Sequence, residues 1–171
     1  MIKNCLIALL MGFSIYVSAQ PKEVLMKTAL LSIEQKKYDI AIQQLNACLD
    51  MDNLSASAYF HRGYCYLMLG KPNVAMVDFN KTLSIDTTLT ETYFNRALAH
   101  QALKNFTFSE GDFMSYLHYF PKDEKAWLSL AFLHEQMEEY RMATADYSAY
   151  LKLKPGTVEV LKYRALAYAE I

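Results

Sequence analysis

Residues 55–88 read SASAYFHRGYCYLMLGKPNVAMVDFNKTLSIDTT, and their pattern of residue types returns every 34 residues along the chain. At that spacing, Tyr59 is followed by Tyr93 and Trp127. Four further columns share the spacing: Gly63, Ala97, Ala131 and Ala165; Ala41, Ala75, Ser109 and Ala143; Leu45, Phe79, Phe113 and Tyr147; and Leu49, Leu83, Leu117 and Leu151. A fixed period of this length is typical of a repeat architecture, in which one supersecondary unit is copied and stacked.

Each unit is predicted to form two helices. In residues 55–88, Tyr59, Gly63 and Tyr66 recur at steps of four and three, so they share one helical face. Gly70-Lys71-Pro72 then breaks the chain, because glycine ends helices and proline opens them. No period-two alternation and no Asn-Gly turn predicts a strand. We therefore predict an all-α solenoid over residues 20–171, with units at about 22–54, 55–88, 89–122 and 123–156 and a partial unit at 157–171.

The unit at 55–88 carries a family resemblance. Its segments Tyr59-Phe60-His61-Arg62-Gly63, Leu69-Gly70 and Ala75-Met76-Val77-Asp78-Phe79 closely resemble the tetratricopeptide repeat, and residues 123–156 resemble it as well. The resemblance implies a right-handed superhelix of helical hairpins, with a concave wall formed by the first helix of each hairpin. It also implies that the chain holds other proteins.

The resemblance assigns a set of mostly apolar and aromatic side chains to the concave wall. They are Met26, Leu30, Phe60, His61, Tyr64, Met68, Phe94, Asn95, Leu98, Leu128 and Phe132. We reject a clamp for a peptide's terminal carboxylate, because Phe60, Phe94 and Leu128 stand at the lysine-type positions. Such a wall suits an apolar helix or an extended apolar segment, since buried apolar area favours binding. The alternative is that the aromatic side chains fill the groove themselves.

Charged residues follow the same period. One column holds Asp78, Asp112 and Asp146, and another holds Arg62, Arg96 and Arg164, with Leu130 in the place of a further arginine. Repetition favours a structural role, since a specific binding site would occur once. We expect arginine–aspartate pairs, either within a unit or between neighbouring units.

Residues 1–19 are a predicted signal peptide. Lys3 precedes an apolar run from Cys5 to Val17, and small residues lead up to Ala19, after which we expect cleavage. The protein would then be exported, to the periplasm or outside the cell. Of the remaining cysteines, we expect Cys48 and Cys65 to be buried free thiols rather than a disulfide.

The charge of the mature chain is weak and balanced. Cleavage removes Lys3, one of 17 basic side chains, and none of the 18 acidic ones, so the net charge changes from −1 to −2. Such a balance gives no electrostatic footprint for nucleic acid or an anionic membrane, and we predict neither as a partner of the mature chain.

Motifs for catalysis are missing from the sequence. No two of the histidines (His61, His100, His118 and His134) lie four residues apart, and there is no glycine-rich phosphate loop. We predict no enzymatic activity, no metal and no cofactor.

The favoured function is an exported scaffold that binds a protein or peptide segment. One alternative is the N-terminal repeat portion of a larger envelope protein, a sensor or an enzyme, truncated at the fifth unit. Another is a structural protein that self-associates through an uncovered C-terminal helix, where Leu161, Leu166, Tyr168 and Ile171 continue the apolar pattern.

Overall fold

The computed structural model describes residues 21–171, and the predicted signal peptide lies outside the described residues. Within residues 21–171 the chain forms helices and no strand. The helices are α2 (Lys22–Glu34), α3 (Tyr38–Met51), α4 (Ala56–Met68), α5 (Pro72–Ile85), α6 (Glu91–Ala102), α7 (Phe106–Tyr119), α8 (Glu124–Gln136), α9 (Tyr140–Leu153) and α10 (Val158–Ala169). The prediction of an all-α fold is confirmed.

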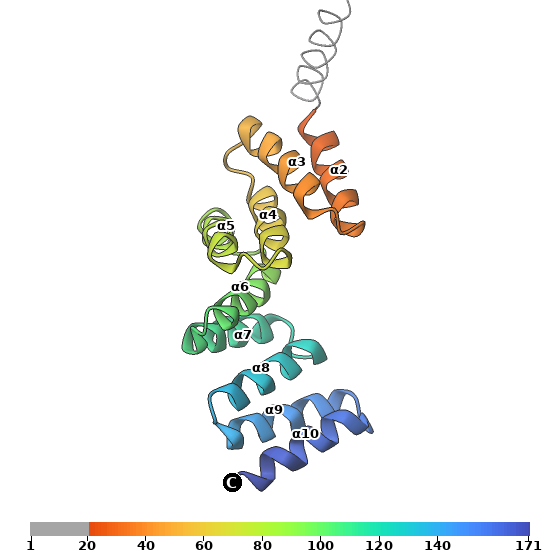
Figure 1. Cartoon of the computed structure of the whole chain (residues 1–171), viewed down its shortest axis with the longest axis vertical. Coiled ribbons are helices and arrows are strands. Elements are labelled where there is room, and N and C mark those ends of the chain that lie inside the picture. The colour runs from red at the N-terminus through yellow and green to blue at the C-terminus, as the bar shows by residue number, and fades with distance from the viewer. Residues whose placement is uncertain (1–20) are drawn as a thin grey trace, which may run out of the picture.

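The helices stack in chain order as antiparallel pairs, and the array winds as it descends from α2 to α10 (Figure 1). The substantial contacts between helices join elements that are adjacent or next but one in the sequence. The hydrophobic core therefore continues from each hairpin into the next, as in an α-solenoid.

The first helices of the first three hairpins contact one another, whereas second helices make no comparable contact with each other. Helix α4 touches both α2 and α6 in addition to the second helices packed against it. Elements on the inside of a curve lie closer together than those on the outside. The first helices of the pairs therefore line the inner side of the array.

The turns inside the four hairpins share one backbone geometry. Each contains a residue with positive φ, and these residues fall 34 apart: Lys36 (57°), Gly70 (69°), Lys104 (60°) and Glu138 (60°). Each turn also closes with the same bond, in which the next amide donates to a carbonyl five residues back, as Lys71 does to Tyr66 at 2.9 Å. This is the Schellman arrangement that ends many helices. The four hairpin turns are thus structurally equivalent.

The close approach of paired helices is set by a glycine in the second hairpin. A Cβ atom added to Gly63 would lie 2.8 Å from Cε1 of Phe79 and 3.2 Å from Cβ of Asp78. Phe79 is fully buried, so its ring has no free space to move into. Gly111, in the middle of α7, has nothing within 4 Å of the corresponding position.

These two glycines predict opposite effects of the same substitution. We expect Gly63→Ala to lower the free energy of unfolding by about 1–3 kcal/mol through overpacking. Gly111→Ala should raise it by about 0.5–1 kcal/mol, because alanine favours a helix over the unfolded chain. Urea denaturation of the two variants measures both. A Gly63→Ala variant as stable as the natural protein would refute the steric argument.

Candidate binding surface

The predicted wall residues lie on the first helices α2, α4, α6 and α8, which line the inner side of the array. Leu30 and Met68 are 36% and 41% exposed. The remaining nine predicted wall residues are half-buried. The wall therefore combines exposed apolar tips with rings that are partly covered by the protein itself.

The wall's phenylalanine rings rest on the aromatic residue of the second helix in the same hairpin. Ring centroids are 6.4 Å apart for Phe60 and Phe79, and 5.5 Å apart for Phe94 and Phe113. In the fourth hairpin Phe132 lies 6.0 Å from Tyr147 with the rings close to perpendicular. Such aromatic contacts fix the orientation of each ring. The rings form a preset surface rather than mobile side chains.

At the N-terminal end the wall opens into a hollow of about 490 Å³. Its lining is Lys22, Glu23, Met26, Lys27, Leu30, Ser55 and Ser57. The hollow brings together the predicted wall residues of α2, Met26 and Leu30, with the start of α4. Ser55 and Ser57 belong to this site but were not predicted, because hydroxyls carry no periodic signal.

Two polar wall residues have particular surroundings. His61 packs edge-on against Phe60 with ring centroids 5.1 Å apart, and burial lowers the pKa of His61, which favours its neutral form. Asn95 donates through Nδ2 to the carbonyl of Glu91 at 2.9 Å, so its amide is turned back on its own helix. Neither supplies a positive charge to the wall.

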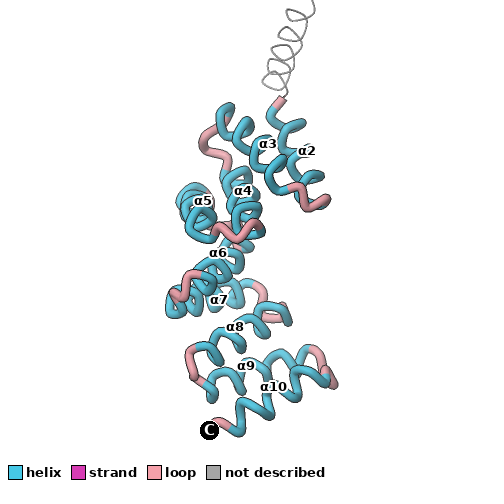
Figure 2. Tube along the Cα trace, in the orientation of Figure 1, coloured by secondary structure: helices cyan, strands magenta, loops and turns pink. Residues whose placement is uncertain are grey.

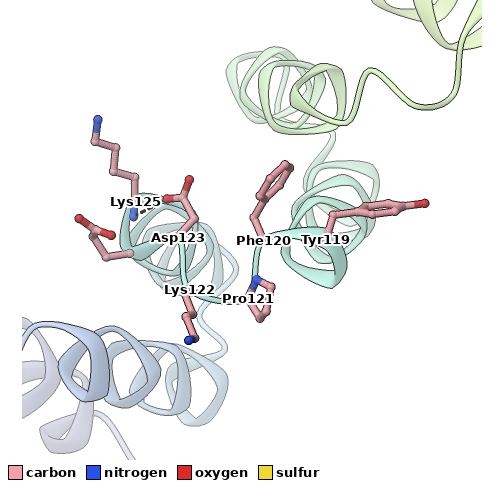
Figure 3. Close-up of a pocket in the computed structure, with 7 residues that line it drawn as sticks. Tyr119, Phe120, Pro121, Lys122, Asp123 and Lys125 are labelled. Carbon is pink, nitrogen blue, oxygen red and sulfur yellow. Dashed lines mark hydrogen bonds between the residues drawn. The ribbon is translucent and has the colours of Figure 1, made fainter.

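A second hollow, of about 550 Å³, lies at the link between α7 and α8 (Figure 3). Phe120 points into the space between these helices, and Tyr119 points away from it. Tyr116 is buried beside this link and donates its hydroxyl to Asp123 at 2.8 Å. Helices α7 and α8 pack less closely than the other neighbouring pairs, in keeping with a large residue at position 116. This hollow includes none of the predicted wall residues.

The arginine–aspartate columns form ion pairs within the second and third hairpins. Arg62 donates through Nε and Nη2 to the two carboxylate oxygens of Asp78 at 2.8 and 2.7 Å. Its remaining nitrogen, Nη1, donates to Asn46 of the preceding hairpin at 2.7 Å. The same three bonds recur 34 residues later. The within-unit interpretation is therefore correct, and these charges hold hairpins together.

In the fourth hairpin a histidine takes the role of the arginine. His134 is 1% exposed, and its Nδ1 lies 2.6 Å from Oδ2 of Asp146. Its Nε2 lies 3.3 Å from Oε1 of Glu110, on α7, and 4.0 Å from Glu139. The sequence pattern gives Asp146 no arginine partner, but His134 follows Leu130 by one helical turn on the same face.

The carboxylates of Asp146 and Glu110, together with burial, set the protonation of the His134 ring. Burial lowers the pKa of His134, but the hydrogen bonds and charges of Asp146 and Glu110 outweigh it, so the pKa lies above its ordinary value of 6.5. Burial raises the pKa of Asp146, and His134 offsets part of that effect. The pair is a buried, proton-dependent link within the fourth hairpin and toward the third.

Cys48 and Cys65 are buried free thiols, as predicted. They lie in the hydrophobic cluster shared by the first and second hairpins. Burial raises the pKa of the Cys65 thiol to about 11, so little reactive thiolate forms at neutral pH.

The tetratricopeptide-repeat family model matches residues 56–88 and 124–157, the second and fourth hairpins. These two hairpins are tetratricopeptide repeats. The chain's resemblance to this family, and the fold that the resemblance implied, are confirmed. Repeats of this family form a scaffold for protein interactions. No curated protein sequence matches the chain.

Several solved tetratricopeptide-repeat structures are similar to this chain. A MamA protein superposes with a TM-score of 0.80 at 21% identity, over 87% of this chain and 81% of that one. YrrB, described as having an unusual peptide-binding site, gives a TM-score of 0.76 at 16% identity, over 85% and 75%. The first such domain of Spaghetti (RPAP3), bound to the HSP90 peptide SRMEEVD, gives 0.65 at 25% identity, over 68% and 92%.

Other features bear on the chemistry of the repeat domain. Within residues 21–171, no group of three or more His, Cys, Asp or Glu side chains is arranged to hold a metal ion. Among the helices of the same residues, none has the length and hydropathy needed to cross a bilayer.

Helix α10 exposes apolar side chains: Leu161, Leu166, Tyr168 and Ile171 are 39%, 65%, 58% and 55% exposed. Self-association through α10 stays a prediction.

The His134–Asp146 pair predicts a pH dependence of stability. Because the folded pKa of His134 is raised, its stabilisation is complete below the unfolded pKa of about 6.5 and is lost as the pH rises through the folded value. We expect the urea midpoint of the natural protein to fall between pH 6 and pH 9. In a His134→Gln, Asp146→Asn variant, whose amides are neutral, the fall should be smaller. Equal declines in both proteins would contradict the assignment.

Proposed function

We propose that this tetratricopeptide-repeat protein is an exported scaffold that docks an apolar segment of a partner protein on the inner wall of the array. The observation that carries the proposal is the composition of that wall. Phe60, Phe94 and Leu128 stand where a carboxylate-binding repeat domain would present lysines, and exposed Leu30 and Met68 extend the apolar surface.

The way the wall's aromatic side chains pack supports binding of a partner segment over the alternative that these side chains fill the groove themselves. Each phenylalanine ring is held by Phe79, Phe113 or Tyr147, so its orientation is fixed before a partner binds and less side-chain entropy is lost on binding. The hollow beside Met26 and Leu30 could accept one large apolar side chain of the partner.

The similar solved structures support a peptide partner in general terms. The RPAP3 domain is bound to an acidic peptide, SRMEEVD, and YrrB is described as having a peptide-binding site. This chain's wall offers little positive charge to an acidic peptide. We therefore favour a segment whose anchors are apolar side chains.

Exposed wall residues give the sharpest test of docking. We expect a Leu30→Glu, Met68→Glu variant to lose at least about tenfold in affinity for captured partners, because two charges would be buried against apolar groups. Affinity capture from an envelope extract identifies partners, and titration with each purified partner gives its affinity. Both side chains are already exposed, so folding should be unaffected.

The matched control is Val77→Glu on the second helix α5, where the side chain is 67% exposed. This variant carries an added charge away from the wall and should capture the same partners as the natural protein. Equal capture by the wall variant and the natural protein would exclude the inner wall as the docking surface.

Export is tested separately. We expect the mature protein to begin at Gln20, because cleavage is predicted after Ala19. N-terminal sequencing and intact mass of the protein recovered from the envelope and the medium would check this. A protein that retains residues 1–19 would overturn cleaved export and leave the docking proposal standing.

A further inference from the structure

Helix α10 is packed on one side only. In Figure 2 it lies at the end of the array, beside α9 and with no other helix of residues 21–171 beyond it. The earlier first helices α4, α6 and α8 each pack between two second helices, the one before them and the one after them. Within the described residues, α10 makes its substantial contact only with the one before it, α9. The side that a second helix of its own would cover is therefore open.

The open side of α10 carries a stripe of residues that are covered at the same repeat positions elsewhere. Leu161, Ala165 and Tyr168 follow one another at steps of four and three, so they share one helical face. All three are exposed, whereas none of their counterparts in the four preceding hairpins is exposed. The counterpart Gly63 faces Phe79 of its own second helix. The exposed stripe is thus the face that a second helix covers in the other hairpins.

Arg164, on the same helix, makes only part of the bonding that its column makes. In the second and third hairpins the arginine donates through Nη1 to the preceding hairpin, and through Nε and Nη2 to the aspartate of its own second helix. Arg164 keeps the first bond, from Nη1 to Oγ of Ser148 at 3.1 Å, and Ser148 stands at the repeat position of Asn80.

The second half of that bonding is missing from Arg164. Within residues 21–171 it forms none of the ion pairs within 4.0 Å. Its guanidinium is therefore anchored on one side by Ser148, while Nε and Nη2 have no carboxylate. A guanidinium held in this way is preorganised for a two-point hydrogen bond to a carboxylate.

The second helices that cover this face in the second to fourth hairpins share three positions. Each has a buried small residue, a buried aspartate three residues later and a fully buried aromatic ring directly after the aspartate. The sets are Ala75, Asp78 and Phe79; Ser109, Asp112 and Phe113; and Ala143, Asp146 and Tyr147. The small residue allows close approach, the aspartate meets a cation and the ring packs on the first helix. Helix α10 thus presents the complement of a helix with the pattern small-x-x-Asp-aromatic.

We propose that the open side of α10 docks a helix of a partner protein that carries this pattern and so completes a fifth hairpin. The partner's aspartate accepts hydrogen bonds from Nε and Nη2 of Arg164, and its aromatic ring packs over Ala165. Leu161 and Tyr168 contact apolar side chains on either side of that ring. The site lies on α10 and is separate from the predicted wall residues, which lie on α2, α4, α6 and α8.

A second copy of the chain fits this site less well. Within residues 21–171 the pattern occurs only at 75–79, 109–113 and 143–147. Each of these segments is buried in its own hairpin and would have to leave that hairpin to cover another copy. Helix α10 itself contains no aspartate to offer to Arg164. The pattern and the free guanidinium therefore favour a different protein as the source of the helix.

A synthetic helix of known sequence tests the site. The probe is a peptide of residues 104–122, which contains α7, with Gly111→Ala to favour the helix. Helix α7 is suitable because its own hairpin has an arginine followed by alanine, Arg96-Ala97, where α10 has Arg164-Ala165. We expect the natural protein to bind the probe saturably in calorimetric titration. An Ala165→Leu variant should bind it at least about tenfold more weakly, because a larger side chain prevents close approach.

The ion pair is tested by a double-mutant cycle. Arg164→Gln in the protein and Asp112→Asn in the probe should each weaken binding by at least about tenfold, because each leaves a charged group without its partner. The two changes together should weaken binding much less than the product of the single effects, since both remove the same pair. Multiplying losses would contradict the pairing of Arg164 with the aspartate.

Controls separate this site from other occupants. The Leu30→Glu, Met68→Glu variant should bind the probe like the natural protein, and loss of binding would place the probe on the inner wall instead. A natural protein whose dimer is dissociated by Ala165→Leu would make a second copy the occupant and overturn the proposal. A natural protein that binds no probe would overturn it as well, and an intact mass above that of residues 20–171 would then place the covering helix in the same polypeptide. Circular dichroism of each variant checks that it is folded.

Discussion

The fold depends on the contact between a small residue on each first helix and a large buried side chain on the second: Leu45 in the first hairpin and an aromatic ring in the next three. Phe79 leaves no room for a Cβ atom on Gly63, and Phe113 is fully buried in the same cluster as Ala97. Because this contact fixes how closely paired helices approach, its repetition gives each hairpin the same shape. Identical hairpins in series can only stack as a regular, winding array.

A layer of buried carboxylates adjoins this contact and must be neutralised. Burying an unpaired carboxylate would cost several kcal/mol, so each aspartate of the column has a cationic partner. Arg62 and Arg96 supply two-point hydrogen bonding, and Asn46 or its counterpart ties the arginine to the preceding hairpin. In the fourth hairpin His134 meets the same requirement, but with a group whose charge depends on pH.

Positions outside this framework are free to serve partners. The inner wall contributes neither the fully buried rings nor the small residues that set helix spacing. The separation follows from the hairpin itself, which buries one stripe of each helix and leaves the others exposed.

The sequence alone determined the helices, their pairing and the period, because small and aromatic residues recur with the spacing that a helical hairpin requires. It also predicted the buried thiols, because free cysteine is usually buried, and the arginine–aspartate layer, because those residues repeat. It left open whether Arg62 pairs within or between hairpins, and it gave no partner for Asp146.

Only the tertiary structure decided those points, because they depend on distances between side chains that are far apart in the sequence. His134 lies off the arginine column, and only the packing of α8 against α9 brings its ring to Asp146.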